Sequence, residues 1–132
     1  MRALSIRQPW AWLIVQGFKP VENRTWSTDY RGPLLIHASK TISRKDYARI
    51  AGELELAFTH PPQIPSFEEV ERGGVVGVVE LVDVVTEHTS PYFTGPFGWV
   101  LDKPRPIAFT PCKGALTLFH VPASALPPGA IA

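Results

Sequence analysis

Residues 17–24, GFKPVENR, decide both the fold and the site of this chain. Gly17 suits the C-terminus of a short helix, and the residues after the proline alternate as those of a strand do. Side chains two residues apart on a strand lie on one face, about 7 Å apart, so Glu22 and Arg24 should share a face, with Lys19 at its mouth. We therefore expect a helix, a turn and a strand that hold an ammonium, a carboxylate and a guanidinium together, either as a functional site or as a surface salt-bridge ladder.

The composition predicts one globular domain over residues 1–132. With 45% hydrophobic and 19% charged residues, the chain is long enough to bury one core. No apolar run reaches the ~18–20 residues of a membrane helix. The single cysteine, Cys112, excludes an internal disulfide and a cysteine zinc cluster. We expect a cytoplasmic protein without a cofactor, present as a monomer or weak dimer.

Charge is unevenly distributed along the chain. Residues 1–50 carry nine Lys and Arg against three Asp and Glu, whereas residues 51–132 carry four against nine. A basic half of this kind is typical of a protein that binds phosphates or nucleic acid, although both halves could also interleave on one solvated surface. The net charge of +1 is too small for tight, sequence-independent nucleic-acid binding.

The remaining hydrophobic pattern predicts short strands and two helices. Strands are expected at residues 3–7, 21–26, 34–38, 75–85, 97–101, 107–109 and 115–121, and helices between Pro9 and Gly17 and from Ser43 to Phe58. Residues 59–73 are expected to form a surface excursion and residues 122–132 a trailing segment. Without regular βαβ alternation, these elements predict an α+β fold, a compact mixed barrel with helices packed outside it.

A second carboxylate lies within the strongest strand signal. Glu80 alternates with Val78 and Val82 and should be buried among valines. A buried carboxylate must neutralise or find a cation, so Lys19 or Arg24 is its expected partner. Glu80 is thus either half of a structural ion pair or a site carboxylate.

The spacing Gly17-x-Lys19-x-x-Glu22-x-Arg24 resembles the G-x-K-x-x-E-x-R signature of the ASCH domain family, relatives of the PUA RNA-binding fold. The resemblance extends to residues 4–10, 75–85, 95–101 and 113–116. It implies a PUA-like mixed β-barrel of about six strands with two or more flanking helices. It also implies a cleft between the barrel and the helices, lined by the signature.

The resemblance implies two functions for such a cleft. Family members are inferred to bind RNA or nucleotides, and some small bacterial members are amidohydrolases that remove the acyl group from N(4)-acetylcytidine and related acylated cytosines. In those enzymes a lysine at the Lys19 position and a glutamate on the strand at residues 75–85 are implicated. The smallest members carry a threonine at the Glu22 position, so its role does not transfer to this chain.

We therefore expect a metal-independent amidohydrolase acting on a nucleoside or a modified base. Two carboxylates favour a charged Lys19, which would stabilise the oxyanion. Glu80 first, and Glu22 second, would act as the base, oriented by Arg24. The alternative is a non-catalytic RNA-binding module in which Arg7, Arg24, Lys40 and Arg44 contact phosphates. A ribonuclease ranks last, because the signature offers neither paired histidines nor metal ligands.

Other residues are weaker candidates for the cleft. Trp10, Trp12 and Trp99 either belong to the core or stack on a base, and Trp10 is the one we expect to stack. Ser39 and Lys40 either supply a hydroxyl and a charge to the cleft or begin the next helix in solvent. The four histidines have no metal-ligand spacing, and His37 is expected to be a core histidine with satisfied hydrogen bonds.

Overall fold

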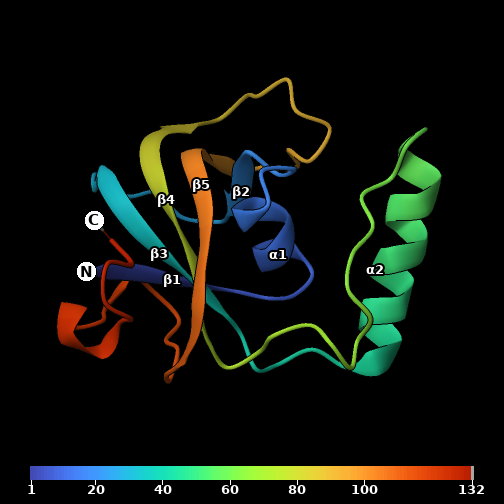
Figure 1. The fold of residues 1–132 in the computed structure, drawn as a ribbon. Helices are drawn as coiled ribbons and strands as arrows, with labels where there is room; N and C mark the ends of the chain where they lie inside the picture. The colour runs from blue at the N-terminus through green and yellow to red at the C-terminus, as the bar shows by residue number, and fades with distance from the viewer. Residues whose placement is uncertain (132) are drawn as a thin grey trace.

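The computed structural model describes residues 1–131 as a mixed six-stranded sheet with helices outside it (Figure 1). The elements are β1 (Arg2–Ile6), α1 (Trp10–Val15), β2 (Val21–Arg24), β3 (Gly32–Ala38), α2 (Arg44–Ala57), β4 (Gly74–Val85), β5 (Phe97–Pro111), β6 (Phe119–His120) and the 3₁₀ turn η1 (Ala123–Ala125). The strand order is β2-β5-β4-β3-β1-β6. Only β1 and β3 are parallel, so the expected α+β fold with a mixed sheet is confirmed.

Helix α1 lies against the sheet so closely that one strand position must be glycine. A Cβ on Gly77 of β4 would lie 2.7 Å from the carbonyl oxygen of Arg105 and nearer still to the side chain of Val15. At the end of α1, Gly17 adopts a φ of +87°, and the amides of Phe18 and Lys19 both donate to the carbonyl of Leu13. This turn directs the chain from α1 into β2, as the sequence predicted.

Helix α2 stands away from the sheet, on the far side of α1 (Figure 1). Ser43 caps it by accepting the amide of Asp46 at 3.1 Å. Its apolar face carries Tyr47, Ile50 and Leu54, which pack in a separate cluster with Leu13 of α1. The predicted excursion at residues 59–73 returns along α2 and completes this cluster rather than lying free on the surface.

The strand predictions fail where prolines and bulges interrupt the pattern. Residues 97–101 and 107–109 belong to one long strand, β5, which carries Pro104 and Pro106 within it. The pairing of β5 with β4 shifts register three times, which accommodates residues that a regular ladder excludes. The strand expected at 115–121 shortens to β6.

The trailing segment packs against the sheet. Leu126 and Ala130 are buried against β3 and β4, and the amide of Val121 donates to the carbonyl of Met1 at 2.8 Å. The two ends of the chain therefore lie side by side, as Figure 1 shows. Residue 132 lies outside the described part of the chain. No helix within residues 1–131 has the length and apolar character that crossing a bilayer requires.

Candidate functional site

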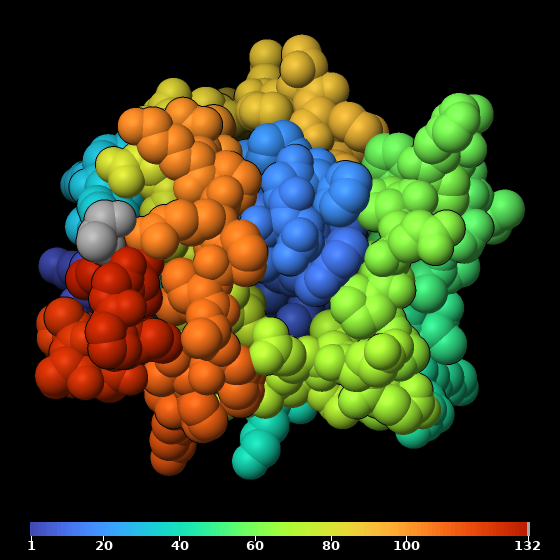
Figure 2. Space-filling view, viewed as in Figure 1, coloured from blue at the N-terminus to red at the C-terminus, as the bar shows by residue number. Residues whose placement is uncertain are grey.

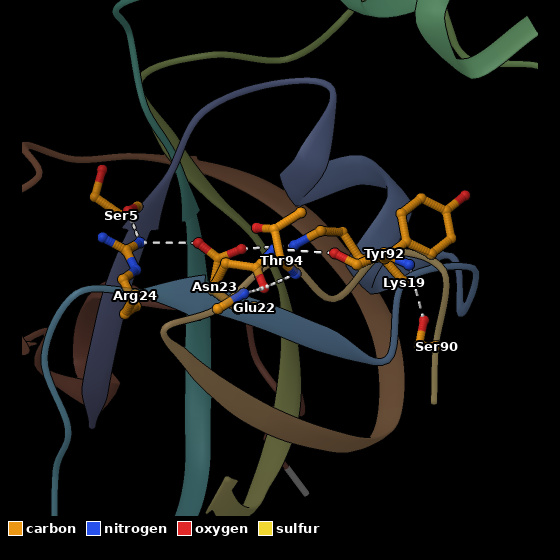
Figure 3. Close-up of polar contacts among 9 residues, drawn as sticks. Ser5, Lys19, Glu22, Asn23, Arg24, Ser90, Tyr92 and Thr94 are labelled. Carbon is orange, nitrogen blue, oxygen red and sulfur yellow. Dashed lines mark hydrogen bonds and ion pairs between the residues drawn. The ribbon is translucent and has the colours of Figure 1, made fainter. Parts of the chain in front are cut away.

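The signature residues form a buried ionic chain beside β2 (Figure 3). The Nζ atom of Lys19 lies 2.7 Å from Oε1 of Glu22, and Nη2 of Arg24 lies 3.2 Å from the other carboxylate oxygen. Lys19 is 4% exposed and Glu22 is 8% exposed. Since Glu22 and Arg24 alternate on one strand with Lys19 just before it, the grouping predicted from the spacing is confirmed.

Several donors in this ionic chain lack protein partners. A lysine ammonium has three N–H donors, and Glu22 is the hydrogen-bond partner of Lys19 among residues 1–131. Arg24 donates from Nη2 to the carbonyl of Ser5 at 2.7 Å, yet within the described chain its Nε is buried with no hydrogen-bond acceptor. Buried donors are costly when unsatisfied, so these groups are suited to a polar ligand or water.

The ionic chain forms one wall of a pocket of about 490 Å³. The pocket is lined by Ser5, Ile6, Arg7, Trp10, Lys19, Glu22, Asn23, Arg24, Glu53, Leu54, Ala57, Phe58, Pro91, Tyr92 and Thr94. The opposite wall thus comes from α2 and from the loop between β4 and β5. In Figure 2 the gold loop lies above the blue residues around α1, and the green helix lies to their right. The expected cleft between barrel and helices is present.

Aromatic rings surround the charged groups of the pocket. The ammonium of Lys19 lies 5.7 Å from the ring centroid of Trp10, a cation–π distance. Across the pocket, the rings of Phe58 and Tyr92 lie 5.1 Å apart and join α2 to the β4–β5 loop. Burial raises the pKa of Tyr92 above its usual value of 10.0. The pocket therefore combines ring surfaces with charge, as a heteroaromatic ligand requires.

Asn23 fixes the loop that carries Tyr92. Its Nδ2 donates to the carbonyl of Tyr92 at 3.0 Å, and its Oδ1 accepts the amides of Thr94 and Gly95 at 2.8 and 3.1 Å. The dashed contacts in Figure 3 include this link between β2 and the loop. Sequence reasoning missed Asn23, although it lies inside the signature. It also missed Glu53 and Phe58, because the pattern that predicts their helix does not show which face lines a pocket, and Tyr92, which lies in a loop without periodic signal.

Glu80 does not line this pocket, and its predicted pairing with Lys19 or Arg24 is wrong. Its neighbours Val79 and Leu81 both point into the core cluster around Trp99, so Glu80 lies on the other face of β4. Glu22 is directly paired with Trp99 and therefore shares the Trp99 face. Glu80 is half-buried beside Tyr30, whose pKa is raised by burial and, to a smaller extent, by the Glu80 charge. Within residues 1–131, Glu22 is therefore the carboxylate that pairs with both cations, and Glu80 does not join them.

The other predicted site residues do not all line the pocket. Arg7 and Trp10 line the pocket, whereas Ser39 and Lys40 line a different cavity. Trp99 is fully buried, and its indole donates to the carbonyl of Trp26. Arg44 lies over the ring of Phe67 and pairs with Glu68, on the exposed side of α2.

His37 is a core histidine, as expected. It is 2% exposed, its Nδ1 lies 3.0 Å from the hydroxyl of Ser5, and its Nε2 lies 2.7 Å from the carbonyl of Cys112. The carbonyl can only accept, so Nε2 donates to it, and the hydroxyl of Ser5 pairs with Nδ1 on the other side of the ring. Across residues 1–131, no cluster of three or more His, Cys, Asp and Glu side chains is placed to hold a metal ion.

The mixed barrel-like sheet, with its helices outside and this pocket beside β2, defines a PUA-like α+β fold. The chain belongs to the ASCH domain family, whose model matches residues 4–94. A crystal structure of a variant of ZmASCH from Zymomonas mobilis is similar, with a TM-score of 0.54 and 15% identity, over 94% of this chain and 91% of that one. At this identity the likeness shows the fold alone.

Curated relatives include activating signal cointegrator 1 from Homo sapiens and from Mus musculus. Each is 34% identical to this chain over 85 residues, which is 64% of the chain and 14% of the relative. The chain thus spans about a seventh of the length of these relatives.

Proposed function

We propose that the pocket binds an acylated cytosine, as a nucleoside or base, and hydrolyses its exocyclic amide. The observation that carries this proposal is the carboxylate of Glu22 held between two cations at the wall of an aromatic-lined pocket. Such a pocket offers ring surfaces for a heterocycle and charged groups for the polarised amide. Amidohydrolases within the resembled family, which act on N(4)-acetylcytidine, support the choice of substrate.

The reaction needs a base and a cation near the acyl carbon. Glu22 takes a proton from a water molecule as the water oxygen bonds to that carbon. Lys19, with two N–H donors not used by Glu22, stabilises the oxyanion that develops on the carbonyl. The C–N bond then breaks, the proton passes from Glu22 to the leaving amine, and cytidine and the carboxylic acid are released.

The neighbouring residues position these groups. Arg24 orients Glu22 by its contact to Oε2 and is itself held by the carbonyl of Ser5. The cytosine stacks on the ring of Trp10, and the edge of the cytosine faces Lys19. In this assignment Glu22 replaces Glu80 as the base, since Glu80 lies on the other face of the sheet.

The test is hydrolysis of N(4)-acetylcytidine in metal-free buffer, followed as release of cytidine. We expect Lys19→Ala and Glu22→Gln to lower kcat/KM by at least about a hundredfold. Glu55→Gln, an exposed carboxylate on α2, should match the unmodified protein. Glu22→Asp keeps the charge and serves as the control that separates loss of chemistry from loss of folding. Circular dichroism of each variant monitors folding. Absence of turnover with acetyl, propionyl and benzoyl amides would reject the enzyme.

A second function is favoured by one feature of the same site. The Glu22 carboxylate contacts both neighbouring cations, as in a purely structural ion pair, and exposed Arg7 lies at the pocket rim. A pocket of this kind would bind an unpaired base of RNA without cleaving it. Salt-dependent binding of a single-stranded oligonucleotide, weakened by Arg7→Ala and accompanied by no turnover, would support this binding module instead.

A further inference from the structure

A second cavity, of about 630 Å³, lies next to the proposed substrate pocket. Its lining includes two lysines, Lys40 and Lys113, and the hydroxyl residues Ser5, Ser39 and Thr41, and it includes no carboxylate. Within residues 1–131, neither lysine lies in an ion pair. Cations and hydroxyls without a balancing acid are the groups that bind a phosphate.

The cavity is shaped by buried contacts and by two glycines. The buried His37 joins Ser5 to the carbonyl of Cys112, so it fixes the segment that carries Lys113. A Cβ on Gly114 would lie 2.9 Å from the Ser5 hydroxyl, so only glycine allows this close approach of the backbone. On the other side, a Cβ on Gly73 would lie 3.4 Å from Cγ of Lys40, which shows that the Lys40 stem runs along the backbone there.

Ser5 links the two cavities. Its carbonyl accepts from Arg24 of the substrate pocket at 2.7 Å, whereas its hydroxyl contacts His37 in the second cavity at 3.0 Å. It lines both cavities, and β1 pairs here with β3 through Ser5 and His37. One residue of β1 therefore separates a site for a base from a cationic site.

We infer that the second cavity binds the phosphate of a nucleotide whose base occupies the substrate pocket. This inference rests on the proposed function, because the base must enter beside Lys19. It specifies the substrate further, as an acylated cytosine that carries a phosphate. The phosphate belongs either to a free nucleotide or to an RNA strand, and in both cases Lys40 and Lys113 contact it while Ser39 and Thr41 donate hydrogen bonds.

The first experiment uses inorganic phosphate alone as the probe. In ¹⁵N-labelled protein we expect saturable shifts of the Gly73 and Gly114 amides, with chloride at equal ionic strength as the blank. The shifts should vanish in Lys40→Ala/Lys113→Ala and persist in Lys45→Ala/Lys103→Ala, which removes the same charge from outside the cavity. No saturable shift, or equal shifts in both double variants, would overturn the inference.

The second experiment tests the link between the cavities. Cytidine 5′-monophosphate or a short oligocytidylate should bind about tenfold or more tightly than cytidine, as a charge-assisted phosphate contact predicts. The gain should disappear in Lys40→Ala/Lys113→Ala, while cytidine itself binds unchanged. A gain confined to the oligonucleotide identifies an RNA strand as the source of the phosphate, and a gain with the mononucleotide identifies a free nucleotide.

Two outcomes separate this inference from the proposed function. Hydrolysis of N(4)-acetylcytidine with equal affinity for cytidine and its phosphates would overturn the phosphate site and leave the proposed function intact. Saturable phosphate shifts at Gly114 without hydrolysis of any acylated cytidine would reject the proposed function and leave a phosphate site that is not linked to a substrate pocket.

Discussion

Glu22 is the residue on which the buried charges depend. It is the ion-pair partner that Lys19 and Arg24 share within the described chain. Because removing one member of a buried ionic group leaves an uncompensated charge, we expect Glu22→Gln to lower the free energy of unfolding by about 3–5 kcal/mol. Urea denaturation measures this loss, and Glu55→Gln should remain within about 0.5 kcal/mol of the unmodified protein. Equal stability of the two variants would show that Lys19 is solvated.

At the residue scale, the sequence predicts a local cluster well and a distant partner poorly. Lys19, Glu22 and Arg24 lie within six positions, so strand alternation alone places them together. Glu80 lies on a strand whose pairing shifts register beside it, between Val78 and Glu80. Such a shift changes which face a side chain occupies, and nothing in a run of valines indicates where it occurs.

Asn23 determines how the β4–β5 loop is held against β2. Its side chain makes three hydrogen bonds to the backbone of Tyr92, Thr94 and Gly95. In Asn23→Ala these contacts are lost, so we expect faster hydrogen exchange at the Thr94 and Gly95 amides, by about tenfold or more. Exchange measured by NMR reports this directly. Hydrogen exchange at the Leu35 amide, in the sheet interior, should not change. Unchanged exchange at Thr94 and Gly95 would mean that other contacts hold the loop.

The close packing of helix α1 on β4 depends on Gly77, a strand residue without a side chain. A methyl group at Gly77 would collide with Val15 and with the Arg105 backbone, so we expect Gly77→Ala to destabilise the protein by about 1–3 kcal/mol or more. Gly52 on α2 offers the matched control, since a Cβ there meets nothing within 4 Å. Gly52→Ala should stabilise the protein by about 0.5–1 kcal/mol. Thermal denaturation that shows a lower stability for Gly77→Ala and a higher one for Gly52→Ala would confirm the close approach of α1.

At the element scale, the helices were predictable and the strand ends were not. The cap at Ser43 and the glycine at residue 17 mark helix ends by local chemistry. Strand β5 crosses two prolines, which normally indicate a break, because its bulged pairing with β4 leaves room for residues that lack an amide hydrogen. Tertiary pairing of this kind is not encoded by hydrophobic alternation.

For the whole molecule, alkaline stability should depend on Tyr47. Burial raises the pKa of Tyr47 to about 12, and its hydroxyl donates to the carbonyl of Pro65 at 2.6 Å. Its usual pKa is 10.0, so the unfolded chain loses this proton first. The stabilising effect is complete below pH 10 and declines as the pH rises toward 12. Tyr47→Phe should flatten this decline in denaturation curves; an unchanged slope would exclude Tyr47 as its source.

Residues 39–73 leave the sheet and return to it at adjacent positions. The amide of Gly73 donates to the carbonyl of Ala38 at 2.7 Å, next to the paired residues Ala38 and Gly74. Residues 39–73 supply Glu53, Leu54, Ala57 and Phe58 to the pocket. Lys19, Glu22 and Arg24 come instead from the α1–β2 segment. Part of the pocket wall is therefore an insertion between the neighbouring strands β3 and β4, with its two ends side by side. Exchange of this segment would therefore reshape the α2 wall of the pocket, while Lys19, Glu22 and Arg24 stay in place on the α1–β2 segment.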